Sequence, residues 1–128
     1  MAKILIVDDE ANVRLALVQT LRNQRHEVID AADGNQALTI LAERQIDLVV
    51  IDIVMPNREG LETIQEIRMN WPDVKIIAIS GGGRMRNSQF LEIAGKLGAH
   101  LMLKKPFSMA ELKNGVSDVL DQELWRSG

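Results

Sequence analysis

Three short runs of apolar, mostly β-branched residues constrain the fold of this chain more than any other feature of its sequence. They cover residues 4–7, 48–51 and 76–79. Runs of this length without polar interruptions are typical of strands buried on both faces, as in a parallel sheet covered by helices. Residues 26–31 and 100–103 are two weaker candidates for strands.

Helical patterns separate these candidate strands. Apolar residues recur every three or four positions in five segments, whose stripes include Leu17, Leu38, Ile64, Ala94 and Val116. The alternation of strand and helix predicts an α/β fold, with helices on both faces of an open parallel sheet. In such sheets, functional sites form beyond the carboxyl ends of the strands.

Two local patterns predict where helices begin. Asp33 stands just before the second helical stripe, in the position of a helix cap. Ser108 and Glu111 have the spacing of a capping box, which predicts the start of the fifth helix.

Composition limits the class of protein. The chain has 128 residues, which we expect to form one domain over residues 1–128. The net charge is −3 with scattered basic residues, so we expect no nucleic-acid surface. There is no cysteine and no apolar run long enough to span a bilayer. We therefore expect a cytoplasmic protein that does not bind membranes.

Polar side chains follow four of the candidate strands. Asp8 and Asp9 follow the first strand, Asp52 the third, Ser80 the fourth and Lys105 the fifth. Because the carboxyl ends of parallel strands meet at one edge, these side chains are candidates for a single site.

If three carboxylates converge, either one of them takes up a proton or a cation binds. Two unit charges about 5 Å apart repel by roughly 3 kcal/mol at an effective dielectric constant near 20. A hard cation with oxygen ligands suits such a pocket, and Mg²⁺ is the candidate, since no His or Cys stands nearby to favour zinc. Lys105 supplies a second positive charge. An aspartate held in this way can act as a nucleophile and form an aspartyl-phosphate.

Four segments resemble the receiver domain of two-component response regulators, the family of the chemotaxis regulator. They read KILIVDDE, VVIDIVMPNREG, IIAISGGG and GAHLMLKKPF, and they stand in the order found in that family. The resemblance implies a flavodoxin-like, doubly wound sheet of five parallel strands in the order 2-1-3-4-5, with five helices. It also implies phosphorelay signalling, with a sensor histidine kinase or phosphotransfer protein as partner and an output protein that the sequence does not identify.

The resemblance further implies a role for each site residue. Asp52 is the phosphoacceptor, and Asp8, Asp9, Asp52 and the backbone carbonyl of Val54 hold Mg²⁺. Lys105 pairs with the phosphoryl group, and its peptide bond to the following proline is cis. Ser80 moves toward the phosphate on activation. Partner binding then changes through the loop after the fourth strand and the face of the fourth helix, fifth strand and fifth helix.

The chain departs from the family pattern in two places. Met102 stands where the family has an aromatic switch residue. Three glycines, Gly81 to Gly83, lengthen the loop after the fourth strand, and Arg84 and Arg86 follow them. Both departures affect how a signal at Asp52 would reach a partner.

Other interpretations remain open from the residues. Asp9 is also placed to cap the first helix. A haloacid-dehalogenase-type phosphatase needs an acid two residues after its nucleophilic aspartate, whereas Asp52 is followed by Ile53 and Val54. A receiver-like module that is never phosphorylated is the second alternative. We expect a regulatory phosphoacceptor, which catalyses only its own phosphorylation and dephosphorylation.

Overall fold

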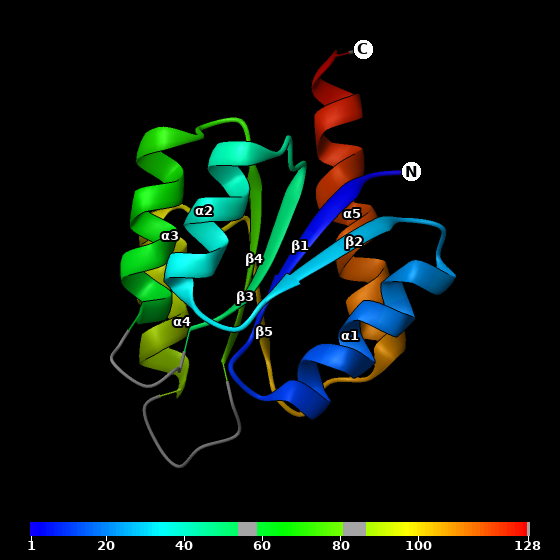
Figure 1. Cartoon of the computed structure of the whole chain (residues 1–128), viewed down its shortest axis with the longest axis horizontal. Coiled ribbons are helices and arrows are strands. Elements are labelled where there is room, and N and C mark those ends of the chain that lie inside the picture. Colours follow the sequence, from blue (N-terminus) through cyan, green and yellow to red (C-terminus); the bar gives the residue numbers. More distant parts are fainter. Residues whose placement is uncertain (54–58, 81–86, 128) are drawn as a thin grey trace.

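Strands and helices alternate along the whole chain (Figure 1). The computed structural model describes residues 1–53, 59–80 and 87–127. The strands are β1 (Lys3–Val7), β2 (Glu27–Ala31), β3 (Leu48–Asp52), β4 (Lys75–Ser80) and β5 (Leu101–Lys104). The helices are α1 (Ala11–Asn23), α2 (Gly34–Glu43), α3 (Glu59–Asn70), α4 (Asn87–Leu97) and α5 (Met109–Ser127). Each strand lies within one residue of its predicted bounds.

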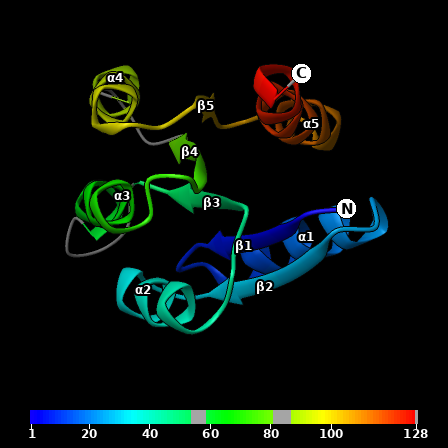
Figure 2. The same ribbon diagram turned by 90° about the horizontal axis from the view of Figure 1, so that it is seen from above.

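The strands form a parallel sheet in the order β2-β1-β3-β4-β5, so the predicted flavodoxin-like order is confirmed. Seen from above, α1 and α5 cover one face of the sheet, and α2, α3 and α4 cover the other (Figure 2). Val7 pairs with Ala31 and Ile51, and Ser80 pairs with Lys104. The carboxyl ends of the strands therefore meet at one edge, the lower edge in Figure 1.

The sheet separates two apolar cores. Side chains alternate between the faces of a strand, so Ile4 and Ile6 pack into the core beneath α1 and α5, which contains Leu17. Leu5 and Val7 pack into the opposite core, beneath α2, α3 and α4. Because both faces are covered, β1 is apolar at every position after Lys3, as its uninterrupted run predicted.

Both predicted helix starts are confirmed. The side chain of Asp33 accepts a hydrogen bond from the Gln36 amide at 2.8 Å. The Glu111 amide donates to Ser108 Oγ at 3.0 Å, and the Ser108 amide donates to Glu111 Oε1 at 3.1 Å. These bonds satisfy amides that the helix itself leaves without partners.

A side-chain bridge ties two loops together at the amino edge of the sheet. Arg68, in the last turn of α3, donates to the carbonyl oxygens of Val74 at 3.0 Å and Gly98 at 3.2 Å. Gly98 has φ of 119°, and a Cβ there would lie 2.8 Å from Arg68 Nε. Only glycine readily combines this backbone conformation with so close a contact.

Several predictions concern residues outside the described ranges. The Val54 carbonyl falls in residues 54–58, and the glycine-rich loop with Arg84 and Arg86 falls in residues 81–86. Within the described residues, no helix is both long enough and apolar enough to cross a membrane.

Candidate functional site

Two aspartates lie at the carboxyl edge of the sheet, on neighbouring strands. Asp8 follows β1 directly, and its amide donates to the Ala31 carbonyl at 3.2 Å. Asp52 is the last residue of β3, and the amide of the next residue, Ile53, donates to the Ile79 carbonyl at 2.8 Å. Strand pairing thus fixes the backbone on which each carboxylate stands. Only 1% of Asp8 and 3% of Asp52 is exposed, so both carboxyl groups are largely removed from water.

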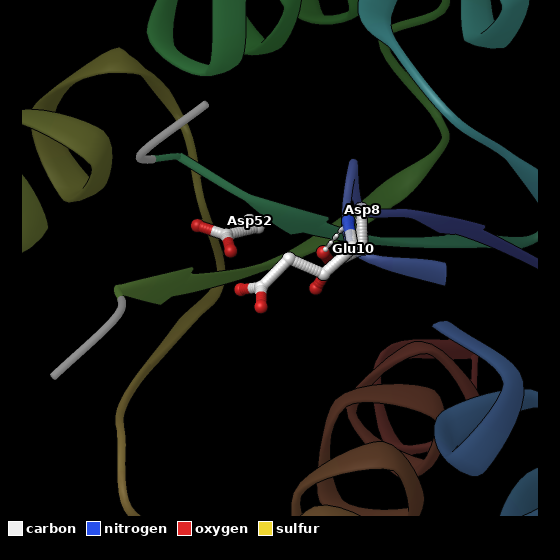
Figure 3. Close-up of side chains that lie close together, drawn as sticks. All are labelled: Asp8, Glu10 and Asp52. Carbon is white, nitrogen blue, oxygen red and sulfur yellow. Dashed lines mark hydrogen bonds between the residues drawn. The ribbon is translucent and has the colours of Figure 1, made fainter. Parts of the chain in front are cut away.

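A third carboxylate joins them, and it belongs to Glu10. One oxygen each from Asp8, Glu10 and Asp52 lies within 4.8 Å of the other two (Figure 3). The Glu10 amide donates to Asp8 Oδ1 at 2.9 Å, which orients the Asp8 carboxylate. Asp9 is exposed and is not part of this group. It does not cap α1 either, because the N-cap residue is Glu10, whose side chain makes no capping hydrogen bond.

Lys105 brings a positive charge to the two buried aspartates. Its Nζ lies 3.4 Å from Asp52 Oδ2 and 3.9 Å from Asp8 Oδ2. The Lys105 amide donates to the Ser80 carbonyl at 2.9 Å, so the end of β4 positions the start of the lysine segment. The Lys105-Pro106 peptide bond is cis, as the resemblance implied. Ser80 is fully buried at the end of β4.

Burial raises the pKa of the Asp8 carboxyl from 3.8 to about 6. The hydrogen bond from the Glu10 amide opposes this rise, the negative charge of Asp52 adds to it, Lys105 opposes it, and Asp9 adds to it. Removal from water disfavours the charged form of a carboxyl group, and nearby carboxylates act in the same direction. A cation at this edge would relieve both effects.

One oxygen of Asp8 has no hydrogen-bond partner among the described residues. This atom, Oδ2, is buried and lies beyond hydrogen-bond distance of Lys105 Nζ. Buried polar atoms are rarely left without a partner in folded proteins. Mg²⁺ prefers oxygen ligands and commonly uses one or two carboxylates together with water. The unpartnered oxygen and the adjacent carboxylates therefore fit a divalent cation.

A comparison with family models identifies the family of this chain. The family model described as "Response regulator receiver domain" matches residues 4–117. The chain belongs to the receiver domain family. A receiver domain is a regulatory phosphoacceptor in two-component signalling, so the sequence resemblance is confirmed.

Relatives of this receiver domain include parts of larger proteins and a protein of similar length. It is 36% identical over 124 residues to the sensor kinase CckA of Brucella abortus, covering 95% of this chain and 13% of that protein. It also spans about half the length of ycf27 proteins described as probable transcriptional regulators. It is 29% identical over 118 residues to sporulation initiation phosphotransferase F of Bacillus subtilis, covering 92% of this chain and 93% of that protein.

Solved structures show the same architecture. A CheY-like receiver domain from Methanospirillum hungatei superposes with a TM-score of 0.87 at 28% sequence identity, and the match covers 100% of this chain and 99% of that one. This receiver domain therefore shares the fold of CheY-like proteins.

The structure brings together most of the residues that the sequence singled out. Asp8, Asp52 and Lys105 converge, and Ser80 ends the strand beside them. Glu10 was not expected in the site. It stands next to two predicted acids in the sequence, but only the path of the loop after β1 shows which neighbour of Asp8 turns toward Asp52.

Proposed function

We propose that Asp52 is the residue on which this receiver domain accepts its phosphoryl group, in a reaction that depends on Mg²⁺. One observation carries the proposal: a carboxylate oxygen of each of two buried aspartates, Asp8 and Asp52, lies within 4 Å of Lys105 Nζ. The three residues come from distant parts of the chain. Such an arrangement supplies a nucleophile together with the charges that phosphoryl transfer requires.

The reaction needs no general base. The donor is a phosphohistidine of the partner or a small phosphorylated compound. An oxygen of the Asp52 carboxylate forms a bond to phosphorus while the bond from phosphorus to the leaving group breaks. The leaving group keeps the electron pair and takes a proton from solvent. A carboxylate is already ionised at neutral pH, so positioning and charge neutralisation are the main tasks of the protein.

Two side chains would act on the phosphoryl group directly. Lys105, already 3.4 Å from Asp52, would pair with the phosphoryl oxygens. Ser80, at the end of the adjacent strand, would donate its hydroxyl to one of them. Charge-assisted hydrogen bonds of this kind are stronger than neutral ones, so they are suited to drive a change of conformation.

For the metal, we propose Asp8, Asp9 and Asp52 with the backbone carbonyl of Val54, and add Glu10 as a further candidate. When bound, Mg²⁺ would offset negative charge on the phosphoryl oxygens. Asp8 has the strongest support because its Oδ2 is buried without a hydrogen-bond partner among the described residues. Asp9 and Glu10 are both exposed, and Glu10 has the further support that one of its carboxylate oxygens lies within 4.8 Å of oxygens of Asp8 and Asp52.

The partner that supplies the phosphoryl group is proposed to be a sensor histidine kinase or a phosphotransfer protein. Support comes from the relatives, which include a sensor kinase and a phosphotransferase. We further propose that the domain works in the cytoplasm and binds neither nucleic acid nor membrane directly. The net charge of −3 supports the absence of a nucleic-acid surface.

For the output, we propose that phosphorylation acts through the loop between β4 and α4 on the face formed by α4, β5 and α5. Met102 on β5 is 39% exposed on this face, and Gly95 of α4 leaves room for its side chain. A Cβ on Gly95 would lie 3.1 Å from Met102 Cε. Methionine is flexible and polarisable, so it can repack there where the family uses an aromatic ring.

Intact mass spectrometry tests the proposal. We expect the domain to gain one phosphoryl group from a small phosphodonor with Mg²⁺ and to gain none when EDTA removes the metal. Asp52→Asn should gain none under either condition. A wild-type protein that folds but never gains mass would support the alternative of a receiver-like module without phosphorylation, and turnover of generic phosphate esters would instead support a phosphatase.

A further inference from the structure

Arg14 connects the loop after β1, residues 8–10, to the neighbouring strand β2. It lies in the first turn of α1, and its amide donates to the Glu10 carbonyl at 2.9 Å. Its guanidinium Nη1 donates to the backbone carbonyl of Asp8 at 2.7 Å, and Nε lies 2.8 Å from Asp30 Oδ2. The side chain is only 19% exposed, so these contacts are partly shielded from water.

Backbone bonds hold the two ends of the loop that Arg14 contacts: the Asp8 amide donates to the Ala31 carbonyl at 3.2 Å, and the Glu10 carbonyl accepts from the Arg14 amide at 2.9 Å. β1 ends at Val7 and α1 begins at Ala11, and the N-cap residue Glu10 makes no side-chain capping bond. The bond from Arg14 fixes the direction of the Asp8 carbonyl. Because a peptide unit is planar, this also fixes the orientation of the Asp9 amide that follows.

Asp30 makes the guanidinium a rigid connection. It lies on β2, the neighbour of β1, and it accepts the Nε hydrogen of Arg14. Its negative charge also compensates the guanidinium locally. Arg14 therefore contacts the backbone of Asp8 as one half of an ion pair, and it is not among the charges that shift the pKa of Asp8, so its influence on the carboxylates is geometric.

We propose that Arg14 is a positioning residue, which braces the loop after β1 so that the carboxylates of Asp8 and Glu10 face Asp52. The inference rests on the proposed function, since its purpose is to preform the site for Mg²⁺ and phosphoryl transfer. Removal of the brace lets the loop take other paths, and metal binding must then order it again.

The same helix offers a matched control. Arg22 Nη2 donates to the Val28 carbonyl at 3.0 Å, so it also connects α1 to β2. Val28 pairs with Ile4, at the end of the strands away from Asp8. Arg22→Ala thus removes a comparable bond without touching the loop of Asp8 and Glu10.

Calorimetric titration with Mg²⁺ tests the brace. We expect Arg14→Ala to weaken the Mg²⁺ affinity about fivefold to tenfold, the effect of one or two lost hydrogen bonds. Arg22→Ala should bind Mg²⁺ like the wild type although it lowers the urea midpoint similarly. Asp30→Ala, at an exposed position, should weaken the affinity in the same direction but less, and it serves if Arg14→Ala does not fold.

A second measurement needs no metal. Hydrogen exchange of the Glu10 amide, which donates to Asp8 Oδ1, should be faster in Arg14→Ala and unchanged in Arg22→Ala. Wild-type exchange and affinity in Arg14→Ala, or equal losses in both arginine variants, overturn the proposal. If the wild type neither binds Mg²⁺ nor gains mass, the proposed function fails, and the Glu10 exchange still decides whether Arg14 holds the loop.

Discussion

Asp8 combines burial with a raised pKa, and this makes the stability of the metal-free domain depend on pH. The folded protein holds the Asp8 proton up to about pH 6, whereas the unfolded chain releases it near 3.8. Between these values the folded state binds more protons, so the free energy of unfolding falls as pH rises. Above pH 6 the loss from this group reaches about 3 kcal/mol.

The corresponding prediction concerns Asp8→Asn. Urea unfolding without metal, measured from pH 4 to pH 8, should show a larger free energy of unfolding for Asp8→Asn than for the wild type above pH 6. The difference should shrink toward pH 4, where the wild-type carboxyl is protonated in the folded state. A constant difference over this range would show that Asp8 titrates normally.

Glu10 and Asp9 form a pair whose contributions to metal binding can be separated. Glu10 lies in the carboxylate group with Asp8 and Asp52, whereas Asp9 does not. We therefore expect Glu10→Gln to weaken Mg²⁺ binding several-fold and to exceed the effect of Asp9→Asn, because the nearer charge attracts the ion more strongly. Calorimetric titration measures both, and the reverse order would favour the pattern implied by the resemblance.

Lys105 provides the third prediction at this scale. Lys105→Ala should still gain a phosphoryl group, since Asp52 keeps its carboxylate, but phosphorylation should no longer change the fold around it. Amide chemical shifts of α4 and β5, compared before and after phosphorylation, measure this coupling. Lys104→Ala is the control because Lys104 is exposed and adjacent. Wild-type shift changes in phosphorylated Lys105→Ala would contradict the expectation.

The site was predictable from the sequence where strand ends determined it. Asp52 and Ser80 end buried strands, and Asp8 follows one, so the sheet alone brings them to the same edge. Glu10 was not predictable in this way. It lies beyond the strand, where a few backbone angles, stabilised by Asp8 and Arg14, decide which side chain turns inward.

At the scale of the elements, Gly60 places α3 directly against the residue that follows β3. A Cβ on Gly60 would lie 2.3 Å from Ile53 Cα and 2.5 Å from the Ile53 carbonyl oxygen. These are backbone atoms of the residue that follows Asp52, so they cannot move without moving the site. The absence of a side chain at Gly60 thus sets the position of α3 against the end of β3.

Gly60→Ala should therefore impair both stability and phosphorylation. We expect a loss of about 1–3 kcal/mol in the free energy of unfolding, the usual cost of overpacking, and slower phosphorylation by a small phosphodonor. Gly95→Ala is the control, because the atom its Cβ meets is the flexible end of Met102. Urea unfolding and intact mass against time measure the two effects. A normal phosphorylation rate in Gly60→Ala would show that the contact is only structural.

Element boundaries were predicted well because they rest on local chemistry. Asp33 and the pair Ser108 and Glu111 mark the starts of their helices, because their side chains form hydrogen bonds with nearby amides. The edge strands were the weaker candidates. β5 alternates half-buried and exposed residues, and its apolar run of three, Leu101 to Leu103, is shorter than the runs of β3 and β4.

At the scale of the whole molecule, a ligand at the carboxyl edge should stabilise the entire domain. Any ligand that binds only the folded state raises the free energy of unfolding, by about 2.7 kcal/mol at a hundred times its Kd. Saturating Mg²⁺ should therefore raise the urea midpoint of the wild type. EDTA should reverse the increase, and Asp8→Asn should show little of it, because Asp8 offers a buried oxygen that has no hydrogen-bond partner among the described residues. An equal increase in Asp8→Asn would place the ion elsewhere.

The bridge made by Arg68 restricts how α4 can move. Its bonds to the Val74 and Gly98 carbonyls hold the carboxyl end of α4 against the loop before β4, at the amino edge of the sheet. The opposite, amino-terminal end of α4 lies near the carboxyl edge of the sheet (Figure 1). A displacement that preserves these bonds keeps the carboxyl end of α4 in place, so the amino end of the helix is the end left freer to move. A change beside Asp52 that displaced α4 would therefore move its amino end further than its carboxyl end, which the Arg68 bonds hold at the far side of the molecule.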